Sequence, residues 1–272
     1  MTRTLTSTSG VELAREVSDA ASRPAAARTL LLDVDGTLAP IAPSPEDAAV
    51  PAATLTSIER LVGAGWTVVL VSGRPVAEIR SMVPVDRIVA IGSHGLEGGF
   101  DGSDERGLSV PDDIVERLDE LESDAAGLAE GFPGVRIERK PAGLAFHDRL
   151  LAGEHLQTWR ERLAGWLAGK HLEGLARLEG KRVLELRPHG VDKGRVVRAV
   201  VERLELPGED RSFVALGDDV TDEDMFREIR GIGLAVLVGE EDRVTLATRR
   251  IDSPEATGEF LAALAEGTDS RS

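Results

Sequence analysis

The chain has 272 residues, of which 42% are hydrophobic and 29% charged, as is typical of a globular protein with one large or two modest domains. Its formal net charge of −16 argues against nucleic acid or an anionic membrane as a partner, because both attract basic surfaces. The absence of Cys excludes disulfides and thiolate chemistry.

The first 27 residues are rich in Thr, Ser and Ala and have no continuous apolar run. They also contain acidic residues, which are not typical of a transit peptide. No stretch of the chain approaches the roughly 18 apolar residues of a membrane-spanning helix. We therefore expect a cytoplasmic protein with a loosely held N-terminal tail at residues 1–27.

Short apolar runs alternate with amphipathic stretches along residues 28–107 and 189–267. Apolar runs that end in Gly, Ser or Asp are typical of strands buried on both faces of a parallel sheet. This alternation predicts an α/β fold whose core is a doubly wound, mostly parallel sheet. The predicted strands are 30–32, 67–71, 87–91, 213–216 and 232–238, and the predicted helices are 51–63, 75–82, 192–204, 222–229 and 255–266.

Residues 108–188 follow a different order. A helix is followed by two strands, a second helix and two more strands, which predicts antiparallel pairing and a small α+β unit inserted into the core as a cap domain. The predicted helices are 110–130 and 153–168, and the predicted strands are 135–140, 144–149, 174–179 and 182–187.

The string DVDGTL at residues 33–38 follows the first predicted strand. Asp33 and Asp35 share one face of an extended segment, and Gly36 permits a sharp turn directly after them. Two facing carboxylates repel each other unless a cation neutralises them, and Mg²⁺ prefers such oxygen ligands. A lone Asp could equally cap a turn, but the whole string at a strand end favours a metal site.

A second acidic string, GDDVTDED at residues 217–224, follows a later strand. Glu223 and Asp224 suit the start of a helix, because the helix dipole favours acids there. That explanation accounts less well for Asp218 and Asp219, which precede the helix. We therefore expect the latter pair to lie near Asp33.

Further polar groups follow other strands or open helices. Ser72 begins the string SGR and is a helix N-cap signal, although a hydroxyl and free N–H groups at that place can also hold a phosphate oxygen. Lys193 lies at the start of a predicted helix. Its side chain could be solvated, or its charge could neutralise a phosphate. Ligands of open α/β sheets bind beyond the carboxyl ends of the strands, so these groups and His94 should converge.

The strings DVDGTL, SGR, DKG (192–194) and GDDVTDEDMF (217–226) resemble the haloacid dehalogenase superfamily of phosphatases. The strings GSHGLE (92–97), ERK (138–140), HDR (147–149) and LELRP (184–188) narrow the resemblance to its trehalose-phosphatase family, over most of residues 28–265. This resemblance implies Mg²⁺-dependent hydrolysis of trehalose 6-phosphate to trehalose and phosphate, in trehalose biosynthesis, through an aspartyl-phosphate. The P-loop, dinucleotide-binding and G-x-S-x-G motifs of other enzyme classes are missing.

The resemblance also implies a role for each site residue. Asp33 would be the nucleophile, and Asp35 would act first as the acid and then as the base. The phosphate would be held by Ser72, Gly73 and Lys193. The metal would be held by Asp33, the backbone carbonyl of Asp35 and Asp218, with support from Asp219 and Asp222.

Recognition of the sugar is implied for Arg74 and His94 of the core and for Glu138, Lys140, His147, Arg149 and Glu185 of the cap, which would close over the substrate. Alternate residues of a strand share a face. A two- or four-residue hairpin loop around Ala142-Gly143 would therefore place Glu138, Lys140, His147 and Arg149 on one face. The family usually has an aromatic residue where Asp148 stands.

Three alternatives remain from the sequence. The chain could be another sugar phosphatase, for example one acting on sucrose phosphate or mannosyl-phosphoglycerate, or a phosphosugar mutase of the same superfamily. It could also be a non-catalytic sugar-phosphate-binding regulator, although a decayed enzyme would be expected to lose at least one of the catalytic residues, and all are present. Each alternative has a small sugar phosphate as its partner, and none indicates an oligomeric state.

Overall fold

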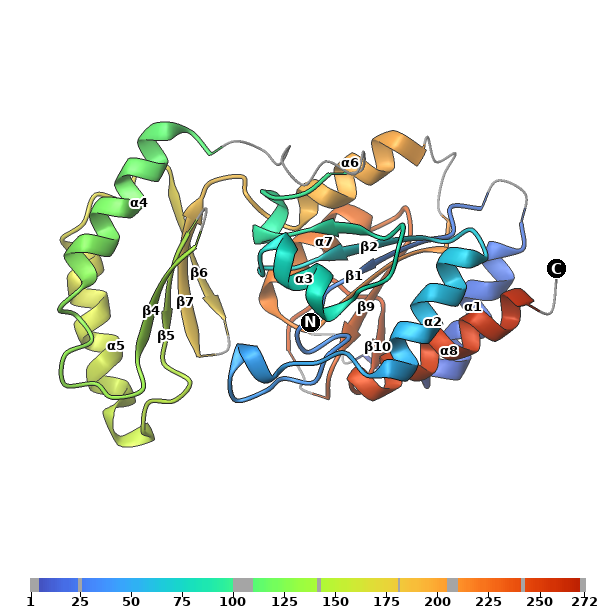
Figure 1. The fold of residues 1–272 in the computed structure, drawn as a ribbon, viewed down its shortest axis with the longest axis horizontal. Coiled ribbons are helices and arrows are strands. Elements are labelled where there is room, and N and C mark those ends of the chain that lie inside the picture. The colour runs from blue at the N-terminus through green and yellow to red at the C-terminus, as the bar shows by residue number, and fades with distance from the viewer. Residues whose placement is uncertain are drawn as a thin grey trace. The chain divides into compact units, whose positions relative to one another are not determined.

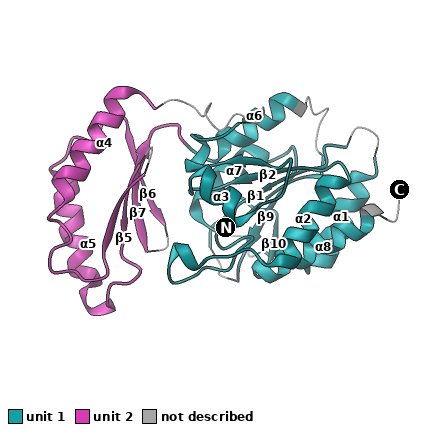
Figure 2. Cartoon of the chain, in the orientation of Figure 1, with its two compact units in different colours: residues 1–107, 192–272 teal, residues 108–191 magenta. Residues whose placement is uncertain are grey.

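The computed structural model describes residues 5–23, 26–99, 110–140, 143–180, 182–204, 210–240 and 243–269. The chain divides into two compact units, unit 1 with residues 1–107 and 192–272 and unit 2 with residues 108–191 (Figure 2). The expected domain boundary near residue 107 lies outside the described residues. No helix within the described ranges is long and apolar enough to cross a membrane.

Unit 1 is built on a six-stranded parallel sheet with the order β10-β9-β8-β1-β2-β3 (Figure 1). The chain moves outward from β1 in both directions, which is the doubly wound arrangement that the alternation of elements predicted. The prediction of an α/β core is therefore confirmed. The strands are β1 (Thr29–Leu32), β2 (Thr67–Val71), β3 (Val89–Ile91), β8 (Phe213–Gly217), β9 (Leu234–Val238) and β10 (Arg249–Ile251).

Helices cover both faces of this sheet, and this explains why the central strands are apolar at almost every position. Leu30 and Leu32 of β1 pack with α1, α2, α3 and α8 on one face. Leu31 points the other way and packs with α6 and α7. The helices are α1 (Gly10–Ala21), α2 (Ala52–Gly63), α3 (Val76–Met82), α6 (Gly194–Leu204), α7 (Glu223–Ile229) and α8 (Pro254–Asp269).

The N-terminal segment is part of unit 1. Ser9 and Glu12 form a capping box at the start of α1, and the apolar face of the helix buries Leu13 and Val17 against the same core as α8. The N–H of Thr8 donates to the carbonyl of Arg250 at 2.8 Å, so the chain before α1 lies beside β10. The expected loosely held tail is thus corrected for residues 5–23, because an amphipathic helix needs a partner for its apolar face.

Unit 2 has a four-stranded antiparallel sheet with the order β4-β5-β7-β6, and α4 and α5 pack together on one of its faces (Figure 1). Leu144, Phe146 and Leu186 form the apolar side of the sheet beneath these helices. This is the α+β arrangement predicted for the inserted segment. The elements are α4 (Asp112–Ala125), β4 (Arg136–Lys140), β5 (Gly143–His147), α5 (Gly153–Ala168), β6 (Leu175–Gly180) and β7 (Val183–Pro188).

Candidate active site

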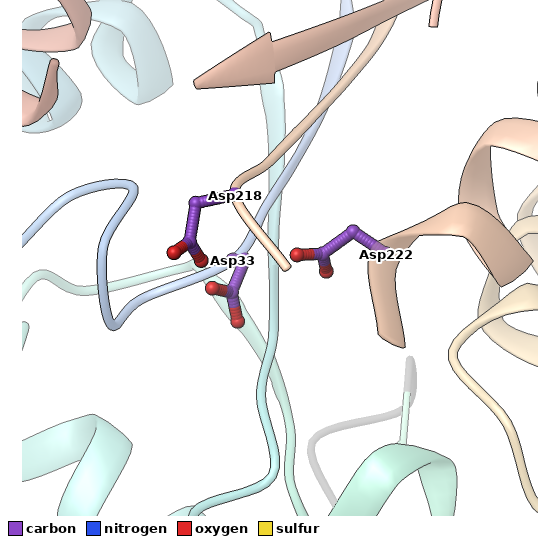
Figure 3. A group of neighbouring side chains, drawn as sticks. All are labelled: Asp33, Asp218 and Asp222. Atoms are coloured by element: carbon purple, nitrogen blue, oxygen red, sulfur yellow. The ribbon is translucent and has the colours of Figure 1, made fainter. Parts of the chain in front are cut away.

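Three carboxylates from separate segments gather at the carboxyl end of the central strands of unit 1 (Figure 3). Asp33 follows β1 and Asp218 follows β8, and these strands are parallel neighbours. Asp222 comes from the short helix η3 (Val220–Asp222). All three side chains are buried, and each offers an oxygen within 4.8 Å of the other two. The carboxylates of residues 33 and 218 are therefore close enough to bind one ion.

Two glycines make room for this cluster. Gly36 has φ +79°, and a Cβ built there would lie 2.3 Å from Oδ2 of Asp218. A Cβ on Gly217 would lie 2.2 Å from Cγ of Asp222. Both approaches are shorter than any side chain tolerates, so both positions need glycine for the carboxylates to approach.

Lys193 supplies a cationic group in hydrogen-bond contact with two of these carboxylates. Its Nζ donates to Oδ1 of Asp33 at 2.6 Å and to Oδ1 of Asp222 at 2.7 Å, and the side chain is buried. Burial alone would lower the pKa of Lys193, but the charges of Asp222 and Asp33 raise it well above its usual range. Lys193 therefore stays protonated inside the cluster.

One ammonium does not balance three buried carboxylates. Burial raises the pKa of Asp33 well above its usual range, Lys193 opposes this, and the charges of Asp222 and Asp218 raise it further. A divalent cation would neutralise the excess negative charge. The donors are all oxygen atoms, which suits a hard cation such as Mg²⁺, so the residues fit the metal site that the sequence predicted.

The loop after β2 lies against the loop after β3. Ser72 is buried, and its Oγ accepts a hydrogen bond from the N–H of Arg74. The side chain of His94 lies over Gly73, where a Cβ would come within 2.7 Å of its Nε2. The structure thus brings Ser72, Gly73 and His94 together, as the convergence of strand ends predicted.

Ser93 and His94 both have positive φ, at 48° and 56°, which is a strained conformation for residues with side chains. Glu97 stabilises this turn, since it accepts hydrogen bonds from Oγ of Ser93 at 2.5 Å and from the N–H of Val76 at 3.1 Å. No role for Glu97 was predicted from the sequence. Its position in the string GSHGLE is the only sequence signal for one.

Asp35 lies outside the three-carboxylate cluster. Both its carboxylate oxygens accept hydrogen bonds from Arg74, at 2.6 Å from Nε and 2.7 Å from Nη2. Arg74 also donates to Glu78 and to the carbonyl of Pro45. Arg74, for which the resemblance implied a contact with the substrate, thus contacts the predicted acid and base.

Asp219 also lies outside the cluster, and it forms hydrogen bonds with Asp222 and Val220. Its N–H donates to Oδ2 of Asp222 at 3.0 Å, and its own side chain caps η3 by accepting from the N–H of Val220. Asp222, for which the resemblance implied a supporting role at the metal, is one of the three clustered carboxylates.

The sheet of unit 2 has one polar face. Glu138 and Glu185 lie opposite Ala145 from either side, so both share its face, and Lys140 and His147 share it too. Nε2 of His147 lies 2.8 Å from Oε2 of Glu138, and Nζ of Lys140 lies 3.1 Å from Oε2 of Glu185. The hydrogen bond with His147 lowers the pKa of Glu138 despite burial, and the charge of Lys140 adds to the effect.

Arg149 does not lie on that face. Strand β5 ends at His147, and Arg149 lies in the exposed turn that follows, so its predicted placement beside the other three residues is corrected. The pairing of Lys140 with Gly143 leaves two residues for the hairpin loop, and these lie outside the described residues. Asp148 is buried and pairs with Arg182, whose Nε lies 2.6 Å from its Oδ1.

A family model described as Trehalose-phosphatase matches residues 31–254. A trehalose-phosphate phosphatase from Mycobacterium avium (strain 104) is 35% identical over 250 residues, which cover 87% of this chain and 62% of that protein. A probable trehalose-phosphate phosphatase from Sinorhizobium fredii (strain NBRC 101917 / NGR234) is 32% identical over 239 residues, covering 87% of each.

A solved structure shares the fold as well. The C-terminal domain of trehalose-6-phosphate phosphatase from C. albicans is 25% identical, with a TM-score of 0.81, and the match covers 97% of this chain and 99% of that chain. The chain therefore spans a whole domain of that relative, but only 62% of the length of the M. avium relative.

Proposed function

The chain belongs to the trehalose-phosphatase family, and we propose that it hydrolyses trehalose 6-phosphate to trehalose and phosphate with the help of Mg²⁺. The observation that carries this proposal is the buried group of Asp33, Asp218 and Asp222 with Lys193 at the strand ends. These residues lie within the segment that matches the family model. A small sugar phosphate as partner and a cytoplasmic location are part of the same proposal.

In the proposed reaction, a carboxylate oxygen of Asp33 attacks the phosphorus, and the bond from phosphorus to the sugar oxygen breaks. Asp35 gives a proton to the leaving sugar oxygen. It then takes a proton from the water that attacks the aspartyl-phosphate, which releases phosphate and restores Asp33. The N–H groups and hydroxyl of the Ser72–Gly73 loop, together with the Lys193 ammonium, bind the phosphoryl oxygens.

The metal would be held by the carboxylates of Asp33, Asp218 and Asp222 and by the backbone carbonyl of Asp35, while Asp219 orients Asp222. When bound, Mg²⁺ neutralises charge on the phosphoryl oxygens and on the clustered carboxylates. The glycines at 36 and 217 permit the close packing that this set of ligands needs. Arg74 holds Asp35, and His94 lies beside the phosphate-binding loop.

We propose that the polar face of unit 2 binds the hydroxyl groups of the sugar through Glu138, Lys140, His147 and Glu185, with Arg149 contributing from the following turn. Support comes from the pairing of His147 with Glu138 on the neighbouring strands β5 and β4, and of Lys140 in β4 with Glu185 in β7, across β5. Such pairs hold donors and acceptors side by side, which suits a ligand with many hydroxyls.

The substrate is tested by phosphate release from a panel of sugar phosphates, with and without Mg²⁺. We expect trehalose 6-phosphate to be the best substrate and activity to require the metal. A preference for sucrose phosphate or mannosyl-phosphoglycerate would assign the chain to another phosphatase activity. Isomerisation without phosphate release would indicate a mutase, and tight binding without turnover would indicate a regulator.

The nucleophile is tested by Asp33→Asn. We expect turnover to fall by at least about 10³-fold, because an amide cannot form the aspartyl-phosphate. Far-ultraviolet circular dichroism should show an unchanged fold. Asp224→Asn is the matched control, since Asp224 belongs to the same acidic string as Asp218 but pairs with Arg227. Full activity of Asp33→Asn would refute this role.

A further inference from the structure

The acidic string at residues 217–224, after β8, is contacted by two cationic side chains. The buried Lys193 binds Asp222. The second side chain is Arg243, which lies in the connection between β9 and β10. It donates from Nη2 to the backbone carbonyl of Asp219 at 3.0 Å. Arg243 also donates from Nη1 to Oε1 of Glu223 at 2.6 Å. The two contacts of Arg243 therefore lie on the two sides of η3, the short helix that presents Asp222.

Glu223 is satisfied at both carboxylate oxygens. Oε1 binds Arg243, and Oε2 accepts a hydrogen bond from the N–H of Leu246 at 2.8 Å. The side chains of Arg243 and Glu223 are only 19% and 15% exposed, so their ion pair is poorly screened by solvent. Glu223 thus does more than favour a helix dipole, since it attaches the start of α7 to the chain that leads into β10.

These contacts lie next to two of the clustered carboxylates in the sequence. Asp218 and Asp222 flank the carbonyl that Arg243 binds, and Glu223 directly follows Asp222. Metal sites depend on ligands that stay in place while like charges repel one another. Among the described contacts, Arg243 makes none with the clustered carboxylates themselves, so any influence on the ion passes through the backbone of residues 219–223.

We propose that Arg243 and Glu223 are positioning residues that hold Asp218 and Asp222 in the geometry that binds the divalent cation. This inference rests on the proposed function, because it assumes that the cluster holds a metal. The alternative is a pair that only stabilises the fold. The two differ in a measurable way: a positioning pair changes affinity for the metal, whereas a purely structural pair changes only the unfolding temperature.

The test is Mg²⁺ binding to the full chain by isothermal titration calorimetry, without substrate and well below the unfolding temperature. For Arg243→Ala we expect the Kd for Mg²⁺ to rise about tenfold, the lower end of the loss seen when a partner of a metal ligand is removed. The Kd of Arg243→Lys should lie between those of the wild type and Arg243→Ala, because lysine keeps the charge but only part of the hydrogen bonding. The KM for the sugar phosphate at saturating Mg²⁺ should stay nearly unchanged.

Arg249→Ala is the matched control. It also removes an Arg–Glu pair of unit 1, with Nη2 of Arg249 at 2.8 Å from Oε1 of Glu16, but it does not touch the acidic string. We expect its Kd for Mg²⁺ to equal that of the wild type. If Arg243→Ala does not fold, Glu223→Gln removes the charge of the pair with little change of shape, and the same rise in Kd is expected.

An unchanged Kd in folded Arg243→Ala or Glu223→Gln overturns the inference, and so does an equal loss in Arg249→Ala. A wild type that binds no Mg²⁺ is a different failure, because it refutes the metal site of the proposed function itself. A double variant, Glu223→Ala with Arg243→Ala, should bind Mg²⁺ no more weakly than Arg243→Ala, since the two residues act as one unit.

Discussion

Arg74 holds Asp35 through two parallel hydrogen bonds, the geometry in which a guanidinium fixes a carboxylate most firmly. An acid and base must lie within reach of the atoms between which it moves a proton. Arg74 is itself held from behind by Glu78 and the carbonyl of Pro45. The orientation of Asp35 is therefore set by a network of groups that are not part of the three-carboxylate cluster.

We predict that Arg74→Ala lowers turnover of the sugar phosphate on the order of 10²-fold, the lower end of what a positioned acid contributes. The leaving group of p-nitrophenyl phosphate needs no proton. With this substrate, transfer of the phosphoryl group to Asp33 should therefore keep its rate, while hydrolysis of the aspartyl-phosphate should slow. Stopped-flow measurement should then show a burst of about one equivalent of p-nitrophenolate. Glu78→Gln is the control and should retain most of the activity, because it leaves the contact with Asp35 intact.

A higher KM for Arg74→Ala, with unchanged kcat and no burst, would contradict this interpretation. It would show instead that Arg74 contacts the substrate, which is the role that its place in the string SGR predicted.

Most elements could be predicted from the sequence because their signals are local. The central strands are almost entirely apolar and alternate with amphipathic stretches of helical periodicity. The predicted bounds of β1, β2, β8 and β9 therefore agree with the observed bounds to within a few residues. Strand β10 was missed, because it has three residues and begins with Arg249 and Arg250. Its position in the sheet is stabilised by pairing with β9, which no local pattern shows.

Helix α1 was missed although a signal was present. Ser9 and Glu12 have the spacing of a capping box, and Leu13 and Val17 mark an apolar stripe. The candidate site could be predicted only in part. The strand-end residues could be predicted from parallel topology, but the contact of Arg243 with the Asp219 carbonyl depends on loop conformations that topology does not determine.

The packing of α1 on α8 depends on a glycine. A Cβ on Gly10 would lie 2.5 Å from the carbonyl oxygen of Ala256 and 2.7 Å from the N–H nitrogen of Phe260. Both are backbone atoms and cannot move without shifting α8. We predict that Gly10→Ala lowers the free energy of unfolding by about 1–3 kcal/mol, the usual effect of overpacking, as measured by urea denaturation.

Gly63→Ala is the control for this prediction. Gly63 ends α2, and a Cβ there meets no atom within 4 Å. The substitution should leave stability unchanged or raise it by up to about 1 kcal/mol, because alanine loses less backbone entropy. Equal effects of the two substitutions would show that α1 does not pack on α8 in solution.

Three segments that are far apart in the sequence meet in one charged group of unit 1. Glu16 of α1 accepts from Nε of Arg249 in β10 at 3.0 Å, across 233 positions of sequence, and from Nη1 of Arg211 ahead of β8 at 2.5 Å. Burial works against the charged carboxylate, but the hydrogen bonds and charges of Arg249 and Arg211 outweigh it and lower the pKa of Glu16 below its ordinary 4.5.

This shift predicts how stability depends on pH. A carboxyl group whose pKa is lowered by folding stabilises the folded state above the unfolded value, and the contribution is lost as pH falls, because the unfolded chain takes up the proton first. Wild type should therefore exceed Glu16→Gln in free energy of unfolding at about pH 7. The difference should close as pH falls through 4.5 and then through the lower folded value.

Urea denaturation of both proteins across this range measures the effect. In a background of Arg211→Ala and Arg249→Ala, Glu16 should lose its advantage over Gln at about pH 7, because the groups that lower the pKa of Glu16 are gone and burial, which raises it, remains. A wild-type advantage that instead grew as pH fell would mean that burial, rather than the two arginines, dominates at Glu16. The N-terminal helix would then be attached by its apolar face alone.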